Sequence, residues 1–227
     1  MARGLLFHHE GHRDHEGGRE RRSEGGAGER DAEAGGATYP GGVARKAGKR
    51  DYLSMARSIS VPPEIPELVE RFGEHIDEYR NGHYNETQVR REYIDPLFIA
   101  LGWDVNNTKG HAEAYKDVIH EDAIKIGGVT KAPDYCFRIG GVRKFFVEAK
   151  KPSVDVKHDV HPAYQLRRYA WSAKLPLSIL TDFEELAVYD TRVCPKRLDK
   201  ASAGRVNYIA YQEYPDRILR RMVSCET

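Results

Sequence analysis

The stretch APDYCFRIGGVRKFFVEAKKP, residues 132–152, decides the fold, because it holds two apolar-rich runs on either side of a glycine pair. The runs DYCFRI and VRKFFVEAK flank Gly140-Gly141, and this pattern predicts an antiparallel β-hairpin. Asp134, Glu148 and Lys150 stand among the apolar residues of these runs. Charged side chains are rarely buried unless they are paired, so the presence of these three in the hairpin needs an explanation.

The register of the hairpin decides whether the two carboxylates meet. A two-residue loop would place Asp134 opposite Val147, and Asp134 would then point away from Glu148, because opposed residues share a face. A three-residue loop instead makes one face largely apolar, with the pairs Ile139–Arg143, Phe137–Phe145 and Tyr135–Val147. The apolar pattern therefore favours this longer loop, or a β-bulge with the same effect. Either brings Asp134 opposite Glu148, with Lys150 two residues further on.

Two adjacent carboxylates on a half-buried surface repel each other unless something neutralises them. Mg²⁺ does so well, since it prefers oxygen ligands and keeps several waters. Lys150 beside the metal could orient or deprotonate a water, or balance charge on a phosphate. This set of groups suits the hydrolysis of a phosphodiester. The alternative is an ordinary cross-strand ion pair among the same three residues.

Length and composition bound the remaining possibilities. The chain has 227 residues and a formal net charge of +1, which predicts one α/β domain and gives no global argument for nucleic-acid binding. No apolar run reaches the roughly 18 residues of a membrane span, and no signal peptide is recognisable, so we expect a cytoplasmic protein without membrane contact. The three cysteines form no CxxC pair, which fits reduced thiols.

The chain divides by composition into three parts. Residues 1–54 are rich in Gly, Arg, Glu and His and carry almost no apolar periodicity. Such a segment cannot bury enough surface to offset its ordering entropy, so we expect a disordered, low-complexity leader. Residues 55–215 are expected to form the folded domain, and residues 216–227 a short C-terminal tail with a weak helical pattern.

Two helices are expected before the hairpin. Leu68, Phe72 and Ile76 recur at helical spacing in residues 61–80, and Gly82 ends that helix. Asn85 then caps a second helix, residues 86–102, in a capping box with the glutamine three residues later. Pro96 inside this helix predicts a kink or a local repair of its hydrogen bonding.

Glu86 lies at the head of the apolar stripe of this second helix, which consists of Val89, Tyr93, Leu97 and Ala100. A carboxylate on the buried face is unexpected and makes Glu86 a candidate site residue. The alternative is a carboxylate that interacts favourably with the helix dipole in the first turn.

Strands and one more helix complete the expected order. Residues 102–106 predict a short strand, and residues 118–126 a strand that ends at Gly127-Gly128. A helix is expected from about Asp159 to Ala173, with Pro162 tolerated in its first turn. Residues 177–182 and 185–190 predict two further strands. The order α, α, β, β, β, β, α, β, β favours a mixed central sheet flanked by helices.

Pro133-Asp134 followed by Glu148-Ala149-Lys150 resembles the PD-(D/E)-x-K nuclease signature. The stretch is most similar to the N-terminal nuclease domain of type I restriction endonuclease R subunits and of single-chain type IIG restriction enzymes. Three further stretches resemble that domain in the same order: residues 85–105, the Gln165-x-x-x-Tyr169 motif, and residues 177–190. The resemblance covers roughly residues 60–215 and implies a restriction-endonuclease-like fold.

The resemblance implies a role for each matching residue. Asp134 and Glu148 match the metal-binding carboxylates, and Lys150 matches the catalytic lysine. Glu86 matches an acidic residue of the first helix that reaches the metal directly or through water. Gln165 and Tyr169 match a helix motif near the site and the DNA backbone, and Arg168 adds positive charge beside them. The alternative for Gln165 and Tyr169 is simple packing with a polar tip.

The resemblance also implies the reaction and the partners. We expect a metal-dependent endodeoxyribonuclease that uses Mg²⁺, with Mn²⁺ as the alternative ion, on double-stranded DNA. The related proteins continue into ATP-dependent translocase or methyltransferase domains, but neither a P-loop nor a methyltransferase-like segment occurs in this sequence. Motor, methyltransferase or specificity components are therefore expected as separate or missing partners. A repair nuclease or exonuclease of the same superfamily, and a non-catalytic DNA-binding module, remain as alternatives.

Overall fold

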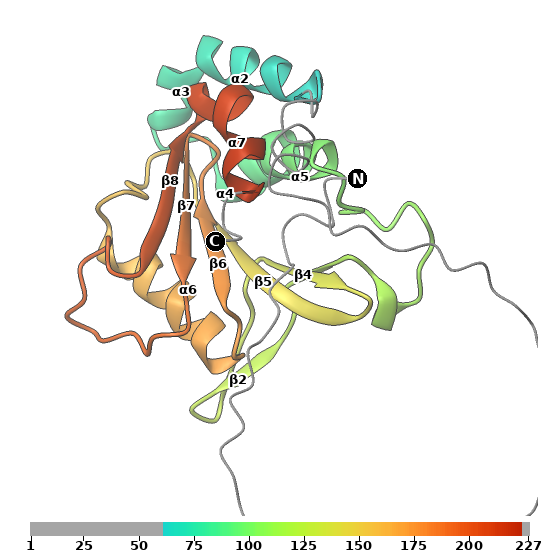
Figure 1. The fold of residues 1–227 in the computed structure, drawn as a ribbon. Coiled ribbons are helices and arrows are strands. Elements are labelled where there is room, and N and C mark those ends of the chain that lie inside the picture. The colour runs from blue at the N-terminus through green and yellow to red at the C-terminus, as the bar shows by residue number, and fades with distance from the viewer. Residues whose placement is uncertain (1–60, 224–227) are drawn as a thin grey trace, which may run out of the picture. The chain divides into compact units, whose positions relative to one another are not determined.

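The computed structural model describes the backbone of residues 61–223 and the side chains of residues 61–218. The leader that we expect to be disordered, residues 1–54, lies outside the described residues. A six-stranded sheet with the order β1-β4-β5-β6-β7-β8 forms the centre and is flanked by helices (Figure 1). The prediction of a mixed sheet flanked by helices is therefore confirmed.

The strands of this sheet are β1 (Val118–His120), β4 (Tyr135–Ile139), β5 (Val142–Ala149), β6 (Leu177–Thr181), β7 (Glu185–Asp190) and β8 (Arg205–Ala210). Only β5 and β6 pair in parallel, whereas the other neighbours pair antiparallel. A parallel pair needs a crossover, and helix α6 (Val160–Ser172) provides it. The helix was expected from about Asp159, and this residue is its N-cap.

The helices before the sheet are α2 (Glu64–Glu74), α3 (Ile76–Arg80), α4 (Glu86–Val89) and α5 (Asp95–Ala100). The predicted capping box is present, since Gln88 N–H donates to the Asn85 side chain at 3.0 Å and Asn85 N–H donates to the Gln88 side chain at 2.9 Å. Between α4 and α5 lies a π-helical turn, η2 (Arg90–Ile94). Because Pro96 has no N–H to donate, the backbone widens by one residue just before it, which confirms the predicted local repair.

Two strand predictions were wrong in detail. Residues 102–106 form a loop, because the Asp104 carboxylate accepts the N–H groups of Thr108 and Lys109 at 2.7 and 3.0 Å. Such local bonds compete with a strand ladder. Residues 118–126 hold two strands rather than one. The second, β2 (Ile124–Ile126), turns at Gly127-Gly128 and pairs with β3 (Val129–Lys131) in a separate ribbon.

The last described residues form a strand and a helix, of which the sequence indicated only the helix, through its weak helical pattern. Strand β8 was not predicted, because its exposed and half-buried residues do not alternate clearly. Helix α7 (Tyr214–Val223) follows the short 3₁₀ turn η4 (Tyr211–Glu213), and a second 3₁₀ turn, η3 (Glu113–Tyr115), precedes β1. Tyr214 and Ile218 of α7 are completely buried, so this helix packs on the same core as α2 and α5.

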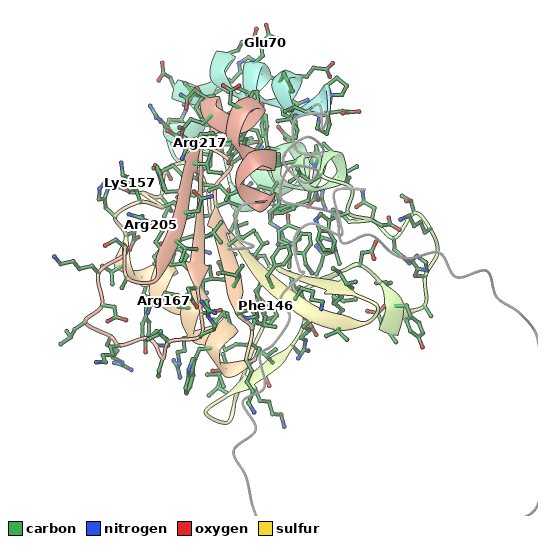
Figure 2. All side chains as sticks on the ribbon, viewed as in Figure 1. Glu70, Phe146, Lys157, Arg167, Arg205 and Arg217 are labelled. Carbon is green, nitrogen blue, oxygen red and sulfur yellow. The ribbon has the colours of Figure 1, made fainter. Side chains whose placement is uncertain are left out.

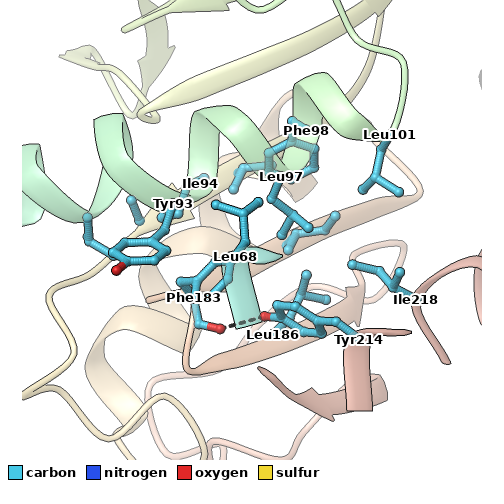
Figure 3. Packing of buried hydrophobic residues seen from close by; sticks show 14 of the residues in the cluster. Leu68, Tyr93, Ile94, Leu97, Phe98, Leu101, Phe183, Leu186, Tyr214 and Ile218 are labelled. Atoms are coloured by element: carbon cyan, nitrogen blue, oxygen red, sulfur yellow. Dashed lines mark hydrogen bonds between the residues drawn. The ribbon is translucent and has the colours of Figure 1, made fainter. Parts of the chain in front are cut away.

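The core lies on both faces of the sheet. One cluster joins α2, α5 and α7 to the sheet and contains Leu68, Leu97, Phe98, Leu186 and Ile218, as Figure 3 shows. A second cluster lies under α6 and includes Phe146, whereas Glu70 projects outward from α2 (Figure 2). Aromatic rings dominate the first cluster: Phe72 contacts four of them, those of Tyr79, Tyr93, Phe183 and Tyr211.

No helix in residues 61–223 is long and apolar enough to cross a membrane. Cys136 is buried and Cys194 is exposed, and both are free thiols.

Replacing Phe72 by alanine should lower the free energy of unfolding by about 3–5 kcal/mol, because the cavity removes four ring contacts at once. Urea denaturation followed by far-UV circular dichroism measures this change. The control is Val142→Ala, at a position that is 59% exposed; its effect should stay within about 0.5 kcal/mol. Equal effects of the two substitutions would contradict the packing described for Phe72.

Candidate active site

The candidate site lies where β4 begins and β5 ends. The ladder pairs Tyr135 with Val147 and Phe137 with Phe145, as predicted, and it shifts between Phe137 and Arg138. The loop itself has two residues, and Ile139 pairs with Val142. The three-residue loop is therefore wrong and the β-bulge is the device that sets the register.

Asp134 directly precedes β4 and is held by two donors. The N–H of Ala149 donates to its Oδ2 at 2.8 Å, and the Arg90 guanidinium donates to its Oδ1 at 3.2 Å. The first bond joins Asp134 to the end of β5, so the carboxylate cannot turn away from Glu148 without losing a hydrogen bond. The register thus brings both carboxylates to the same edge of the hairpin.

Glu148 and Lys150 form the centre of the site. Glu148 is only 4% exposed, and its Oε1 accepts the Lys150 ammonium at 2.9 Å. The same ammonium donates to the backbone carbonyl of Ala149 at 2.7 Å. Glu148 Oε2 is buried and has no hydrogen-bond partner among the described residues. A buried carboxylate oxygen without a partner is costly, so a group that binds it would be strongly stabilised there.

Glu86 reaches the site from the first turn of α4. Its Oε2 lies 3.6 Å from the Lys150 ammonium, and its side chain is 40% exposed. Glu86 therefore lies at the rim of the site, on the solvent side of the lysine. The ammonium of Lys150 is thus surrounded by three oxygens, which come from Glu86, Glu148 and the Ala149 carbonyl.

Helix α6 adds the polar residues that the sequence motif predicts. Gln165 donates its Nε2–H to Glu148 Oε1 at 2.7 Å. Tyr169 lies one turn further on and packs in the cluster under α6, where burial raises the pKa of its hydroxyl and the Glu148 carboxylate adds to this rise. Arg168 is exposed, and among the described residues it forms no hydrogen bond or ion pair with either carboxylate. Arg167, labelled in Figure 2, pairs with Asp199 at 2.9 Å.

Burial and charge set the protonation of the central groups. Burial raises the pKa of the Glu148 carboxyl to about 7; Lys150 opposes this rise and Asp134 adds to it. Burial also raises the pKa of Glu86, again opposed by Lys150. Burial alone would lower the pKa of the Lys150 ammonium, but Glu148 and Glu86 outweigh it, and the pKa is raised. Lys150 is therefore protonated at neutral pH, and Glu148 is close to its titration midpoint.

The donor set can be compared with the needs of a divalent cation. Within the part of the chain whose side chains are described, no group of three or more His, Cys, Asp or Glu residues is arranged as a metal site. The donors at this edge are instead two carboxylates and a backbone carbonyl, which are hard oxygen ligands of the kind that Mg²⁺ takes together with water. The partnerless Glu148 oxygen supplies a free ligand position, so the residues fit such an ion.

Sequence reasoning missed Arg90. Its guanidinium donates to Asp134 and lies 4.8 Å from the centre of the Tyr135 ring, whose hydroxyl donates to Asp95 at 2.7 Å. The available signal was the spacing of Glu86 and Arg90, since residues four apart share a helix face. The contact with Asp134 joins residues 44 positions apart, and no local pattern reveals it.

The raised pKa of Glu148 predicts how stability depends on pH without metal. The folded chain keeps this proton up to about pH 7, whereas an unfolded glutamate loses it near 4.5. The folded state therefore binds more protons in this window, and its stability falls as the pH rises from about 4.5 to about 7. At about 1.4 kcal/mol per pKa unit, the fall is on the order of 3 kcal/mol.

Thermal unfolding in EDTA across this pH window tests the prediction. Glu148→Gln has no titrating proton and should lose most of the fall, whereas Glu70→Gln on the outside of α2 should keep it. Parallel curves for the wild type and Glu148→Gln would contradict the assigned protonation.

No family model matches the chain, and no solved structure matches it. The chain is similar to the type II restriction enzyme and methyltransferase RM.Eco57I of Escherichia coli, with 41% identity over 156 residues. This match covers 68% of the chain and 16% of the length of that protein. The similarity relates the chain to a restriction–modification enzyme, of which it spans a small part.

Proposed function

We propose that this chain is a Mg²⁺-dependent DNA endonuclease domain of a restriction system, with a PD-(D/E)-x-K site that hydrolyses phosphodiester bonds. One observation carries the proposal: the buried, partnerless oxygen of Glu148 lies beside Asp134 and Lys150. In a structural ion pair, both oxygens of a buried carboxylate are in most cases hydrogen-bonded. The similarity to a restriction enzyme supports DNA as the substrate.

Asp134, Glu148 and the carbonyl of Ala149 are the groups that would hold the ion, with Glu86 approaching from α4. When bound, Mg²⁺ supplies a water that is more easily deprotonated and a positive charge on the phosphate. Mn²⁺ prefers the same kinds of ligand and is the alternative ion.

The side chains then have distinct tasks. Lys150 is protonated, so it balances negative charge on the phosphate rather than removing a proton from water. Gln165 holds Glu148 Oε1 and keeps the other oxygen directed toward the site. Asp134 is held by Ala149 and Arg90. This organisation exists before substrate arrives and costs no reorganisation at the moment of reaction.

The relative is about six times longer than the matched part, so the remaining functions of a restriction system lie elsewhere in our proposal. Sequence recognition and methylation would come from further segments or partner chains. In this proposal the nuclease site and these further components all bind double-stranded DNA. The nuclease site would then depend on these components to choose where it cuts.

The test is nicking of closed-circular plasmid by the full chain with Mg²⁺, Mn²⁺ or EDTA. Lys150→Ala and Asp134→Asn should each lower the cleavage rate by about 10³-fold or more, since each removes a group required for charge stabilisation. Lys200→Ala, an exposed lysine in the loop before β8, is the matched control and should cleave like the wild type. Circular dichroism verifies that each variant is folded.

Two results would reject the proposal. One is full cleavage by folded Asp134→Asn or Lys150→Ala. The other is cleavage that continues in EDTA. Activity confined to linear DNA would instead indicate an end-dependent nuclease of the same chemical class.

Arg90 provides a second test, through its bond to Asp134. Arg90→Gln should raise the Mg²⁺ concentration for half-maximal cleavage by about 10-fold, because residues that orient metal ligands typically contribute 10–100-fold to metal affinity. Arg91→Gln is the control, because Arg91 is the next residue in the sequence and its side chain is exposed. A Mg²⁺ titration of the rate measures the effect. An unchanged half-maximal concentration in Arg90→Gln would show that Asp134 needs no such support.

A further inference from the structure

The ribbon of β2 and β3 has no role in the proposed chemistry, yet it is built beside the site. Figure 1 shows it standing apart from the six-stranded sheet, near α6. Its first strand follows a segment that is tied to the site, since Glu121 N–H donates to the Asp134 carbonyl at 3.1 Å. Its second strand ends at Lys131, three residues before Asp134. The ribbon therefore begins and ends at the candidate active site.

One strand of the ribbon is anchored and the other is open. Ile124 and Ile126 are buried in the cluster under α6, with Ala163, Leu166 and Ala170 of that helix. All three residues of β3 are exposed, from Val129 to Lys131. Because the apolar anchor fixes β2, the exposed strand is held at a defined place beside the site and is not a loose loop.

The charge of the ribbon has one sign. Lys125 and Lys131 are the charged residues of its segment 124–131, which contains no carboxylate. They lie on opposite faces, because Lys125 pairs with Thr130 and Lys131 with Ile124. Arg168 of α6 adds a third cation, with its Nη2 close to Gly127. In the described part of the chain none of these three cations forms an ion pair, unlike Arg167 or Arg138.

The tip is narrow. Gly127 and Gly128 have φ values of 57° and 83°, and this left-handed pair makes the tight turn of a two-residue hairpin. Without side chains, the tip can approach another backbone closely. A two-stranded ribbon also has the width that the major groove of DNA accepts.

We propose that the β2–β3 ribbon enters a groove of duplex DNA, where Lys125 and Lys131 bind phosphates on either side and hold the duplex at the site. This inference rests on the proposed function for its choice of DNA as occupant. Phosphate contacts of this kind fix the position and orientation of the duplex without reading its sequence. Arg168 extends the same contact along α6 toward Gln165.

The test measures binding of the full chain to a short labelled duplex of mixed sequence, in EDTA, across a range of KCl concentrations. The double variant Lys125→Ala/Lys131→Ala should bind more weakly, and its slope of log affinity against log salt should fall by about two. The matched control is Lys196→Ala/Lys200→Ala, which removes the same charge from the exposed loop between β7 and β8. The control should keep the slope of the wild type.

The outcomes separate this inference from the proposed function. If the wild type cleaves with Mg²⁺ but the ribbon variant binds like the control, the inference is wrong and the nuclease stands. If binding depends on the ribbon but no metal supports cleavage, the nuclease is wrong and the inference stands. Unchanged DNA binding with altered self-association would overturn the inference. It would show instead that the open edge of β3 pairs with a β-strand of another protein chain.

Discussion

The pairing of β4 with β5 is the constraint on which both the core and the candidate site depend. Its apolar residues face both sides of the sheet, so a slip of one residue would exchange the two faces. The bulge between Phe137 and Arg138 absorbs the one-residue mismatch between the short loop and the apolar pattern. Beyond the bulge, Asp134 accepts a hydrogen bond from the N–H of Ala149. Its carboxylate therefore lies at the end of β5, where Glu148 is located.

Burial of Glu148 distinguishes this edge of the sheet from an ordinary charged surface. Desolvation raises the pKa of the Glu148 carboxyl to about 7. Its Oε1 accepts hydrogen bonds from Lys150 and Gln165, whereas its Oε2 accepts none from any described group. A structural carboxylate in the same fold looks different. Asp122 accepts from both Arg138 and Arg143, and its pKa is lowered despite the opposing effect of burial. Both oxygens of the Asp122 carboxylate are hydrogen-bonded, whereas one oxygen of the Glu148 carboxylate has no partner among the described residues.

Helix α6 has three structural tasks that are linked by its geometry. As the crossover it permits the parallel pairing of β5 with β6, and its apolar face covers the sheet. Gln165 on the edge of that face reaches Glu148. The same helix anchors Ile124 and Ile126 of the ribbon, so one element aligns the strand that carries Glu148 with the ribbon. The π turn before Pro96 similarly combines a backbone repair with the placement of Arg90.

The sequence by itself determined the elements whose signals are local. These are the hairpin around Gly140-Gly141, the capping box at Asn85, the crossover helix and the register that brings Asp134 toward Glu148. Apolar periodicity, capping residues and glycine turns act over a few positions, so a single chain segment reveals them. The candidate residues Glu86 and Gln165 also followed from their spacing and from the family motif.

Tertiary structure decided what depends on distant contacts. It assigned residues 102–106 to a loop, added β8, and separated β2 and β3 from the main sheet. It also bound Arg90 to Asp134 and left one Glu148 oxygen without a partner. Hydrogen bonds between segments tens of residues apart, and the burial that shifts a pKa, arise only when the chain is packed. No local pattern encodes them, because the partner of each group is chosen by the fold as a whole.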